Sequence, residues 1–327
     1  MTELLTVGEL LRRATAYLTE KGSPSPRLDA EVLLAWVLGW ERVSLYVNYD
    51  QPLQADEVAR YRELVGRRAK KVPVALLRGF KEFFALPFTV SPAVLIPRPE
   101  TEFLVQEVLS WLVEQGAEVI LPTGRTLGGP KPDAAGAGEG RGEVPAGRRA
   151  TGWTVADVGT GSGCIAVTVA KCAPGTRVVA TDRSTAALMV AEANAARHGV
   201  VERVEFLVGD GPAPLRQAGW TGKLDVLASN PPYIPTAVLD ELGQDVAYEP
   251  REALDGGPDG LQFYREWVPQ AGAFLRPGGL LALEIGHDQG PAVREMVEAT
   301  GEFAEATIIQ DHGGRDRVVR AVRREEP

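Results

Sequence analysis

The feature that most constrains the fold of this chain is a regular alternation of short apolar runs and helical patterns after residue 152. Strands are predicted at 154–158, 177–181, 204–208, 224–228 and 280–285, and helices at 164–172, 184–198, 261–275 and 289–300. This alternation predicts an α/β fold, with a twisted, mostly parallel sheet and helices on both faces. Two last strands, 304–310 and 317–322, have a short connection, which indicates an antiparallel hairpin at one edge.

A glycine-rich turn, 159–163 (GTGSG), joins the first of these strands to the first helix. Alternate glycines let a ligand approach the backbone closely, and N–H groups at a helix start can bind a carboxylate. Asp182 ends the next strand, where an acid can accept hydrogen bonds from both hydroxyls of a ribose. Asp210 and Gly211 lie at the tip of the third strand, where they can meet an adenine.

The same turn helps to choose the cofactor. Nicotinamide dehydrogenases prefer G-x-G-x-x-G, and Cys164 stands where the third glycine would be needed. S-adenosylmethionine fits better, because it carries an adenosine and an amino-acid carboxylate. Its sulfonium methyl group would lie toward Asn230.

A second motif, Asn230-Pro231-Pro232-Tyr233, follows the fourth strand. The two prolines end the strand and stiffen the loop, because neither can donate a ladder hydrogen bond. The Asn230 side chain and the Pro231 backbone carbonyl are two acceptors that suit a substrate NH2 group, and Tyr233 can stack on a planar group. A planar substrate group that carries NH2 is an amide side chain or a nucleobase; the competing interpretation is that the motif is only a turn.

Residues 1–75 are predicted to form a small helical bundle. Helices are expected at 6–20, from Ser25 or Pro26 to Leu38, near 43–47 and at 54–71, with a capping box at Thr6 and Glu9. Gly39 can cap the second helix. The basic end of the last helix (Arg67, Arg68, Lys70 and Lys71) is interpreted as a solvated face that complements the helix dipole.

The residues after the bundle divide into a linker and a large domain. Residues 76–96 are expected to form a β-hairpin linker that turns at Ala85-Leu86-Pro87. A helix is predicted from Glu100 through Trp111, within a domain that spans 97–327. Its Gly- and Pro-rich stretch, about 121–151, is expected to be a flexible surface insertion.

Composition restricts the partners. A net charge of −9 disfavours broad binding to a nucleic-acid backbone. The sequence contains no run of 18 apolar residues, so no membrane span is predicted. Cys164 and Cys172 lack metal or redox spacing and the N-terminus does not resemble a signal peptide, so a cytoplasmic protein is expected. No metal is expected, since the histidines (His198, His287 and His312) are scattered.

Four segments together resemble the HemK/PrmC family: 157–163 (DVGTGSG), 230–233 (NPPY), 96–102 (IPRPETE) and 249–254 (EPREAL). Members of this family are protein-(glutamine-N5) methyltransferases that act on peptide chain release factors. The resemblance covers nearly the whole chain. It implies a Rossmann-like class I S-adenosylmethionine-dependent methyltransferase domain with an N-terminal substrate-recognition domain. The 121–151 insertion departs from the usual short connection of the family.

The resemblance also implies the substrate, which is the glutamine of a Gly-Gly-Gln loop, and the site residues. The expected catalytic residues are Asn230, Pro231 and Tyr233. Residues expected to bind substrate are Asn230, Pro231, Pro232, Tyr233, Phe83, Arg98, Glu100 and Thr101. Residues expected to bind the cofactor and its product S-adenosylhomocysteine are Asp157, Val158, Gly159, Thr160, Gly161, Asp182, Asp210, Gly211 and Asn230.

Some of these residues have a competing structural interpretation. Asp157 can support the glycine turn, and Phe83 can equally be a packing residue. Glu249 and Arg251 are interpreted as ion-pairing residues that hold the loop after Tyr233. A monomer is expected.

Three other functions compete. One is a sister enzyme that methylates a glutamine of a large-subunit ribosomal protein, which would share the motifs. Another is a nucleic-acid adenine-N6 methyltransferase, which predicts a basic groove that the acidic composition disfavours. A module that only binds S-adenosylmethionine is disfavoured by the intact motif at 230–233.

Overall fold

The computed structural model describes residues 5–128, 152–243 and 245–325, and the chain divides into two compact units. The helical unit contains Met1–Lys81 and Leu242–Tyr248, and the sheet unit contains Glu82–Glu241 and Glu249–Pro327. The helical unit thus extends past residue 75, and residues 76–96, expected to form a linker, are divided between the two units. No sequence pattern indicates that Leu242–Tyr248 belongs with the N-terminal helices.

The described residues of the helical unit form the predicted bundle. Its helices are α1 (Val7–Glu20), α2 (Pro26–Leu38), α3 (Arg42–Val47), α4 (Ala55–Ala69) and α5 (Val74–Arg78). Their apolar faces meet in one core, which includes Leu10, Leu18, Leu33, Leu34, Leu45 and Tyr61. Gly39 ends α2 in the left-handed conformation, as predicted. At α1, Thr6 accepts from the Glu9 N–H, but the Glu9 carboxylate pairs with Arg13 instead of completing a capping box.

The basic end of α4 corrects one prediction. Arg68 is not on a solvated face, because only 4% of its side chain is exposed. Its guanidinium contacts Asp29 at 2.7 Å and Asp245 at 2.9 Å. A helical pattern places Arg68 beside Arg67, but the partners that make it a buried ion-pairing residue come from α2 and from the distant segment 242–248.

The hairpin near residue 85 begins later than predicted. Residues 74–78 form helix α5, and the hairpin is β1 (Phe80–Phe83) and β2 (Leu86–Thr89). Its turn is at Phe84 and Ala85, which have φ of 51° and 58°, so Leu86 and Pro87 belong to the second strand. A short apolar run such as 74–78 suits either a helix or a strand, which is why periodicity did not separate them.

The described part of the sheet unit contains a seven-stranded sheet. The strands are β5 (Trp153–Val158), β6 (Thr176–Asp182), β7 (Val204–Val208), β8 (Leu224–Ser229), β9 (Leu275–Glu284), β10 (Thr307–Gln310) and β11 (Asp316–Val322). Their spatial order is β10-β11-β9-β8-β5-β6-β7. Strands β5 to β9 are parallel, and β11 is antiparallel to both β9 and β10. The predicted mostly parallel sheet with an antiparallel edge is confirmed.

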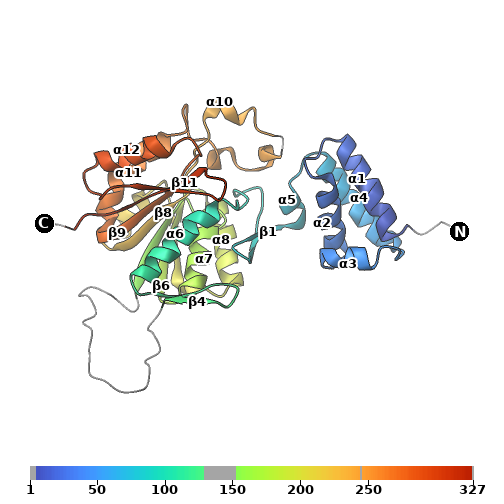
Figure 1. Ribbon diagram of the computed structural model, residues 1–327, viewed down its shortest axis with the longest axis horizontal. Coiled ribbons are helices and arrows are strands. Elements are labelled where there is room, and N and C mark those ends of the chain that lie inside the picture. Colours follow the sequence, from blue (N-terminus) through green and yellow to red (C-terminus); the bar gives the residue numbers. More distant parts are fainter. Residues whose placement is uncertain (1–4, 129–151, 244, 326–327) are drawn as a thin grey trace, which may run out of the picture. The chain divides into compact units, whose positions relative to one another are not determined.

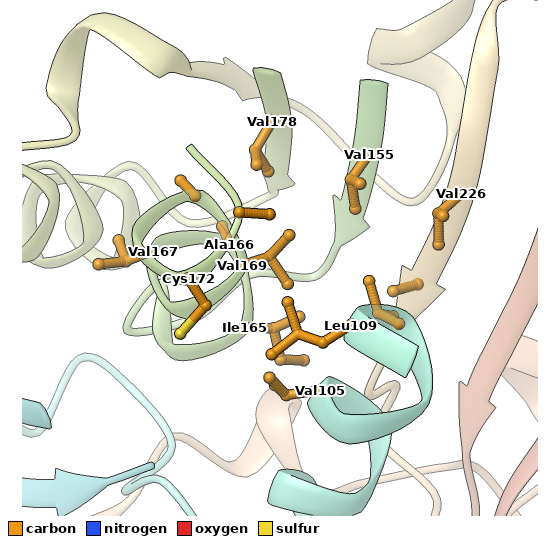
Figure 2. Close-up of a cluster of buried hydrophobic side chains, with 14 of the residues drawn as sticks. Val105, Leu109, Val155, Ile165, Ala166, Val167, Val169, Cys172, Val178 and Val226 are labelled. Atoms are coloured by element: carbon orange, nitrogen blue, oxygen red, sulfur yellow. The ribbon is translucent and has the colours of Figure 1, made fainter. Parts of the chain in front are cut away.

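Helices cover both faces of this sheet (Figure 1). One face packs against α6 (Thr101–Glu114), α7 (Cys164–Cys172) and α8 (Thr185–Arg197), and the other against α11 (Gln262–Phe274) and α12 (Gly290–Ala299). Figure 2 shows the first face, where Val105 and Leu109 of α6 meet Ile165 of α7 beneath Val155 and Val226 of the sheet. Alternate residues of the central strands face the two layers, so these strands are mostly apolar, with Asp157 and Asp225 as exceptions near the strand ends.

Several local features lie outside the sequence predictions. Strand β9 begins at Leu275, before the predicted start at residue 280, and an irregularity opposite Leu224 and Val226 accommodates residues 277–279 within it. The start of the expected insertion is ordered: β3 (Glu118–Ile120) pairs antiparallel with β4 (Thr126–Gly128). Residues 129–151, the rest of that expected insertion, lie outside the described residues. Two short helices, α9 (Ala213–Gln217) and α10 (Thr236–Leu239), are too brief to give a periodic pattern.

None of the helices in the described part of the chain combines the length and the apolar character needed to cross a lipid bilayer.

Candidate active site

A cleft opens at the carboxyl ends of the parallel strands, where the strand order changes direction between β5 and β8. It contains about 700 Å³ of empty space, part of it open to solvent. Seven of the residues selected from the sequence line it: Gly159, Gly161, Asp182, Asp210, Gly211, Asn230 and Pro232. Because these residues follow four different strands, the sheet topology is what brings them together.

The glycine turn has the backbone geometry that its glycines allow. Gly159, Gly161 and Gly163 have φ of 77°, 55° and 78°, and a Cβ atom placed at Gly161 would meet nothing within 4 Å. The Asp182 carboxylate accepts the N–H of Gly161 at 2.9 Å and that of Ser184 at 2.8 Å. Asp182 therefore connects the glycine turn to the start of α8 while it lines the cleft.

Asp157, Val158 and Thr160 lie beneath the turn and do not line the cleft. The Asp157 carboxylate accepts the Thr160 hydroxyl at 2.6 Å and the Ala166 N–H at 3.1 Å. Burial raises the pKa of Asp157 to about 7 in spite of these hydrogen bonds. The geometry fits the interpretation of Asp157 as a support for the turn.

Other parts of the cleft wall were missed by the sequence reasoning. They include Ala93, Val94, Leu95, Glu252, Phe263 and Trp267. The rings of Phe263 and Trp267 pack edge to face, with centroids 5.1 Å apart. A Cβ atom at Gly211 would lie 2.5 Å from Trp267 Nε1, so glycine is needed there. The i, i+4 spacing of the two aromatic residues on α11 is the signal that could have grouped them.

The Asn230 side chain is held by the first residue of α6. Its Nδ2 donates to Thr101 Oγ1 at 3.1 Å. With the NH2 group engaged in this way, the Oδ1 carbonyl is the part of the amide that can accept from a ligand. Thr101 itself is buried, with 2% of its surface exposed.

Behind these residues lies a buried acid that no motif indicated. Glu284, the last residue of β9, is 1% exposed, and its carboxyl group accepts hydrogen bonds from Thr101 and from the Tyr233 hydroxyl, the latter at 3.4 Å. Burial raises the pKa of Glu284 to about 7. The available signal was an acid at the end of the apolar run 280–285.

The remaining predicted residues take supporting positions. Arg98 pairs with the buried Glu249, which also accepts the Ile96 N–H at 2.8 Å, so Glu249 anchors the proline-rich segment. Arg251 pairs with Asp240 and Asp255. Phe83 is 1% exposed in the hydrophobic core, where its ring packs against Phe88, which favours its interpretation as a packing residue.

Among the described residues, no group of three or more His, Cys, Asp or Glu side chains could hold a metal ion. His198 is turned toward the Pro87 carbonyl at 2.9 Å, and His312 packs on Phe103. The polar groups placed at and behind the cleft are amide, hydroxyl and carboxyl groups.

Comparison with known proteins assigns both parts of the chain. Residues 9–79 match the PrmC N-terminal domain, and residues 147–258 match the Methyltransferase small domain. Among solved structures, the protein-(glutamine-N5) methyltransferase (release factor-specific) from Alicyclobacillus acidocaldarius is 28% identical, with 73% of this chain and 100% of that chain covered and a TM-score of 0.39.

Two curated relatives match over their full length. The release factor glutamine methyltransferase of Moorella thermoacetica is 43% identical over 326 residues, which cover 100% of both chains. The release factor glutamine methyltransferase of Geobacter sulfurreducens is 42% identical, with 97% of this chain and 96% of that one covered. Together with the observed sheet topology, these matches confirm the class I methyltransferase fold and show that the chain belongs to the release factor glutamine methyltransferase family.

Proposed function

We propose that this chain transfers a methyl group from S-adenosylmethionine to the side-chain amide nitrogen of the glutamine in the Gly-Gly-Gln loop of a peptide chain release factor. The observation that carries the proposal is the orientation of Asn230 at the edge of the cleft. Its NH2 group is held by Thr101, so its Oδ1 can accept a hydrogen from a substrate amide. The names of the full-length relatives support the release factor as substrate over a ribosomal protein.

The cleft suits S-adenosylmethionine by its charges and by its open backbone. Its wall contains three carboxylates (Asp182, Asp210 and Glu252) and one basic side chain, Arg183. This set favours a ligand with cationic sulfonium and ammonium groups, and it disfavours a dinucleotide with two phosphates. No atom lies closer than 4.0 Å to the place where a side chain would begin at Gly159 or Gly161, so a ligand can approach the backbone of the turn closely. When bound, S-adenosylmethionine supplies an electrophilic methyl group carried on its sulfonium sulfur.

The chain's own residues act on the acceptor amide. Its nitrogen is a poor nucleophile, because the lone pair is delocalised into the carbonyl. Asn230 Oδ1 and the Pro231 carbonyl accept its two N–H groups, which orients the nitrogen and stabilises the positive charge that develops on it. With S-adenosylmethionine bound, the nitrogen held by these two acceptors would take the methyl group as the carbon–sulfur bond broke, and it would then lose one proton to water. This proton is far more acidic after methylation, so no strong general base is required.

Other residues position these groups. The ring of Tyr233 is proposed to pack on the amide plane, and Asp182 to accept from the ribose hydroxyls. Arg98, held by Glu249, is proposed to line the entrance for the substrate with Glu100, whereas the buried Thr101 acts on the substrate only through Asn230. The helical unit is proposed to recognise the release factor. A monomer located in the cytoplasm is part of the proposal.

The test is methyl transfer from labelled S-adenosylmethionine to a purified release factor, with the modified residue located by mass spectrometry. We expect one methyl group on the glutamine of the Gly-Gly-Gln loop. In the Asn230→Ala variant, kcat should fall about 100- to 1000-fold. The dissociation constant of the cofactor should change less than about threefold, because the lost contact is to the acceptor amide.

Two results would contradict the proposal. Label in a ribosomal protein or in DNA, with none in the release factor, would overturn the substrate. Equal losses of turnover and of cofactor binding in Asn230→Ala would overturn the role of Asn230.

A further inference from the structure

A chain of hydrogen bonds connects the buried acid Glu284 to Asn230. Asn230 Nδ2 donates to Thr101 Oγ1 at 3.1 Å, and the Thr101 hydroxyl is hydrogen-bonded to the Glu284 carboxyl group. The Tyr233 hydroxyl lies 3.4 Å from Glu284 Oε1. Two residues of the motif at 230–233 are therefore connected to one carboxyl group, which belongs to a different strand and is itself outside the cleft wall.

The direction of this chain follows from the number of hydrogens available. A threonine hydroxyl has one hydrogen, and a carboxylate can only accept. When Thr101 donates to Glu284, its oxygen must act as the acceptor toward Asn230. Asn230 can satisfy that acceptor only with its NH2 group, so its Oδ1 is turned to the opposite side. The carboxylate thereby excludes the flipped amide, which would present NH2 to the NH2 of a substrate.

The surroundings of Glu284 agree with a role other than ion pairing. Its Oε2 is buried and has no hydrogen-bond partner among the described residues, and its backbone carbonyl accepts the Tyr264 hydroxyl at 2.7 Å. The charged and titratable groups that act on the carboxyl group are Glu100, Arg317, Tyr233, Tyr264 and Cys164. Arg317 favours the carboxylate and Glu100 opposes it, but Arg317 is paired directly with Asp311 at 2.8 Å.

We propose that Glu284 is a positioning residue, which acts through Thr101 to fix the Asn230 amide with Oδ1 toward the acceptor and through the Tyr233 hydroxyl to hold the Tyr233 ring. This inference rests on the proposed function and deepens it, because it assigns the device that lets the site accept an NH2 group. It also explains why an acid is buried without a cation beside the site.

The kinetic test compares variants that differ only in this chain of hydrogen bonds. Glu284→Gln keeps the shape but can donate to Thr101, which allows the Asn230 amide to flip, and Thr101→Val removes the connection. Each should lower kcat about 10- to 100-fold, with a change below about threefold in the cofactor dissociation constant. Thr101→Ser, which restores the hydroxyl, should retain more activity than Thr101→Val. Tyr264→Phe is the matched control, because it removes a hydrogen bond to the same residue but outside the chain that leads to Asn230.

The double variant Glu284→Gln with Thr101→Val separates positioning from general structural damage. If Glu284 acts through Thr101, the double variant should lose no more activity than the more damaging single variant. Losses that multiply would overturn the inference, as would unchanged kcat in both single variants. In the wild type, kcat/KM should rise as pH increases through about 7, where Glu284 becomes a pure acceptor, and Glu284→Gln should lack this rise.

A readout without turnover keeps the inference distinct from the proposed function. The side-chain NH2 resonances of Asn230, observed by ¹⁵N NMR, should shift as pH passes through about 7 in the wild type and not in Glu284→Gln or Thr101→Val. Such a shift in a protein that leaves the release factor unmethylated would overturn the proposed function and support the positioning role. Methyl transfer by the wild type without such a shift would overturn the positioning role alone.

Discussion

Buried acids in the two units of this protein differ in whether a cation is paired with them. In the helical unit, Glu31 contacts Arg27 at 2.9 Å and Arg42 at 3.2 Å, and Asp29 contacts Arg68 at 2.7 Å. At the cleft end of the sheet unit, Asp157 and Glu284 are buried with hydrogen-bond donors but without a paired cation among the described residues. Each of these two acids also has one carboxyl oxygen without a partner there.

Whether a buried acid is paired depends more on the end of the sheet at which it lies than on the unit that contains it. Asp225 near the start of β8, at the edge opposite the cleft, is buried and paired with Arg276. Burial raises the pKa of both Asp157 and Glu284 to about 7. In Glu31 burial acts in the same direction, but hydrogen bonds from Tyr46 and Arg27 and the charge of Arg42 outweigh it, so its pKa is lowered. The two unpaired acids therefore both lie where the site is built, although Glu249, which is buried near the cleft, is paired with Arg98.

The largest effect should come from removing a cation from a buried pair. Arg68→Met leaves the buried Asp29, and Asp245, without a cation and should destabilise the helical unit by about 3 to 5 kcal/mol. Arg67→Met is the matched control, since Arg67 is exposed on the same turn, and it should cost less than about 0.5 kcal/mol. The loss of unfolding free energy in each variant is measured by urea denaturation, with hydrogen exchange of the α2 and α4 amides as the signal. Equal losses in the two variants would remove the distinction between paired and solvated arginines.

The next effect concerns the unpaired Asp157. Its pKa is raised on folding from 3.8 to about 7, so its contribution to stability is fully present below about pH 3.8 and is lost as pH rises through about 7. Asp157→Asn should therefore weaken the decline in unfolding free energy between pH 4 and 8 by about 2 to 4 kcal/mol. Urea titrations at several pH values measure the slope, with the exposed Asp259→Asn as control. An unchanged slope in Asp157→Asn would show that this acid is ionised in the folded protein.

Glu31 should behave in the opposite sense. Because its pKa is lowered on folding, its contribution is present above its usual value of 4.5 and is lost as pH falls through the folded value. Glu31→Gln should cost about 1 kcal/mol at neutral pH, a small amount because Arg27 and Arg42 are largely exposed, and should reduce the loss of stability in acid. The same titrations extended below pH 4 test it. A change confined to the range above pH 5 would contradict the pairing.

An effect on ligand binding, with the smallest change in stability, is expected for an acid that lines the cleft. Asp182→Asn removes a charged acceptor proposed for the ribose and should weaken cofactor binding about tenfold, with little change in unfolding free energy. Calorimetric titration with S-adenosylhomocysteine measures the affinity. Asp288→Asn, exposed in the loop before α12, serves as the control. If both variants bind equally well, Asp182 acts only on the glycine turn.

Local pattern predicted much of the sheet unit. The helix Cys164–Cys172 and the strand Val204–Val208 have the predicted bounds, because apolar periodicity and the flanking turn residues depend only on local sequence. The same patterns failed where two structures suit one short sequence, as at 74–78, or where a side chain finds distant partners, as at Arg68. The cleft residues selected from strand ends converged because parallel strands align their carboxyl ends.

Local sequence patterns did not predict the residues that position or enclose the site. Thr101 and Asn230 are 129 positions apart, and Glu284 lies on yet another strand. Phe263 and Trp267 reach the cleft only because α11 packs on the sheet face beside Gly211.

The sequence by itself determined the order of strands and helices, the glycine turn and the motif at 230–233, because backbone geometry and hydrophobic periodicity depend on neighbouring residues. Only the tertiary structure decided which acids have cations, which way the Asn230 amide faces and which aromatic residues close the cleft. These properties depend on burial and on partners from distant segments, and burial is set by the packing of the whole unit.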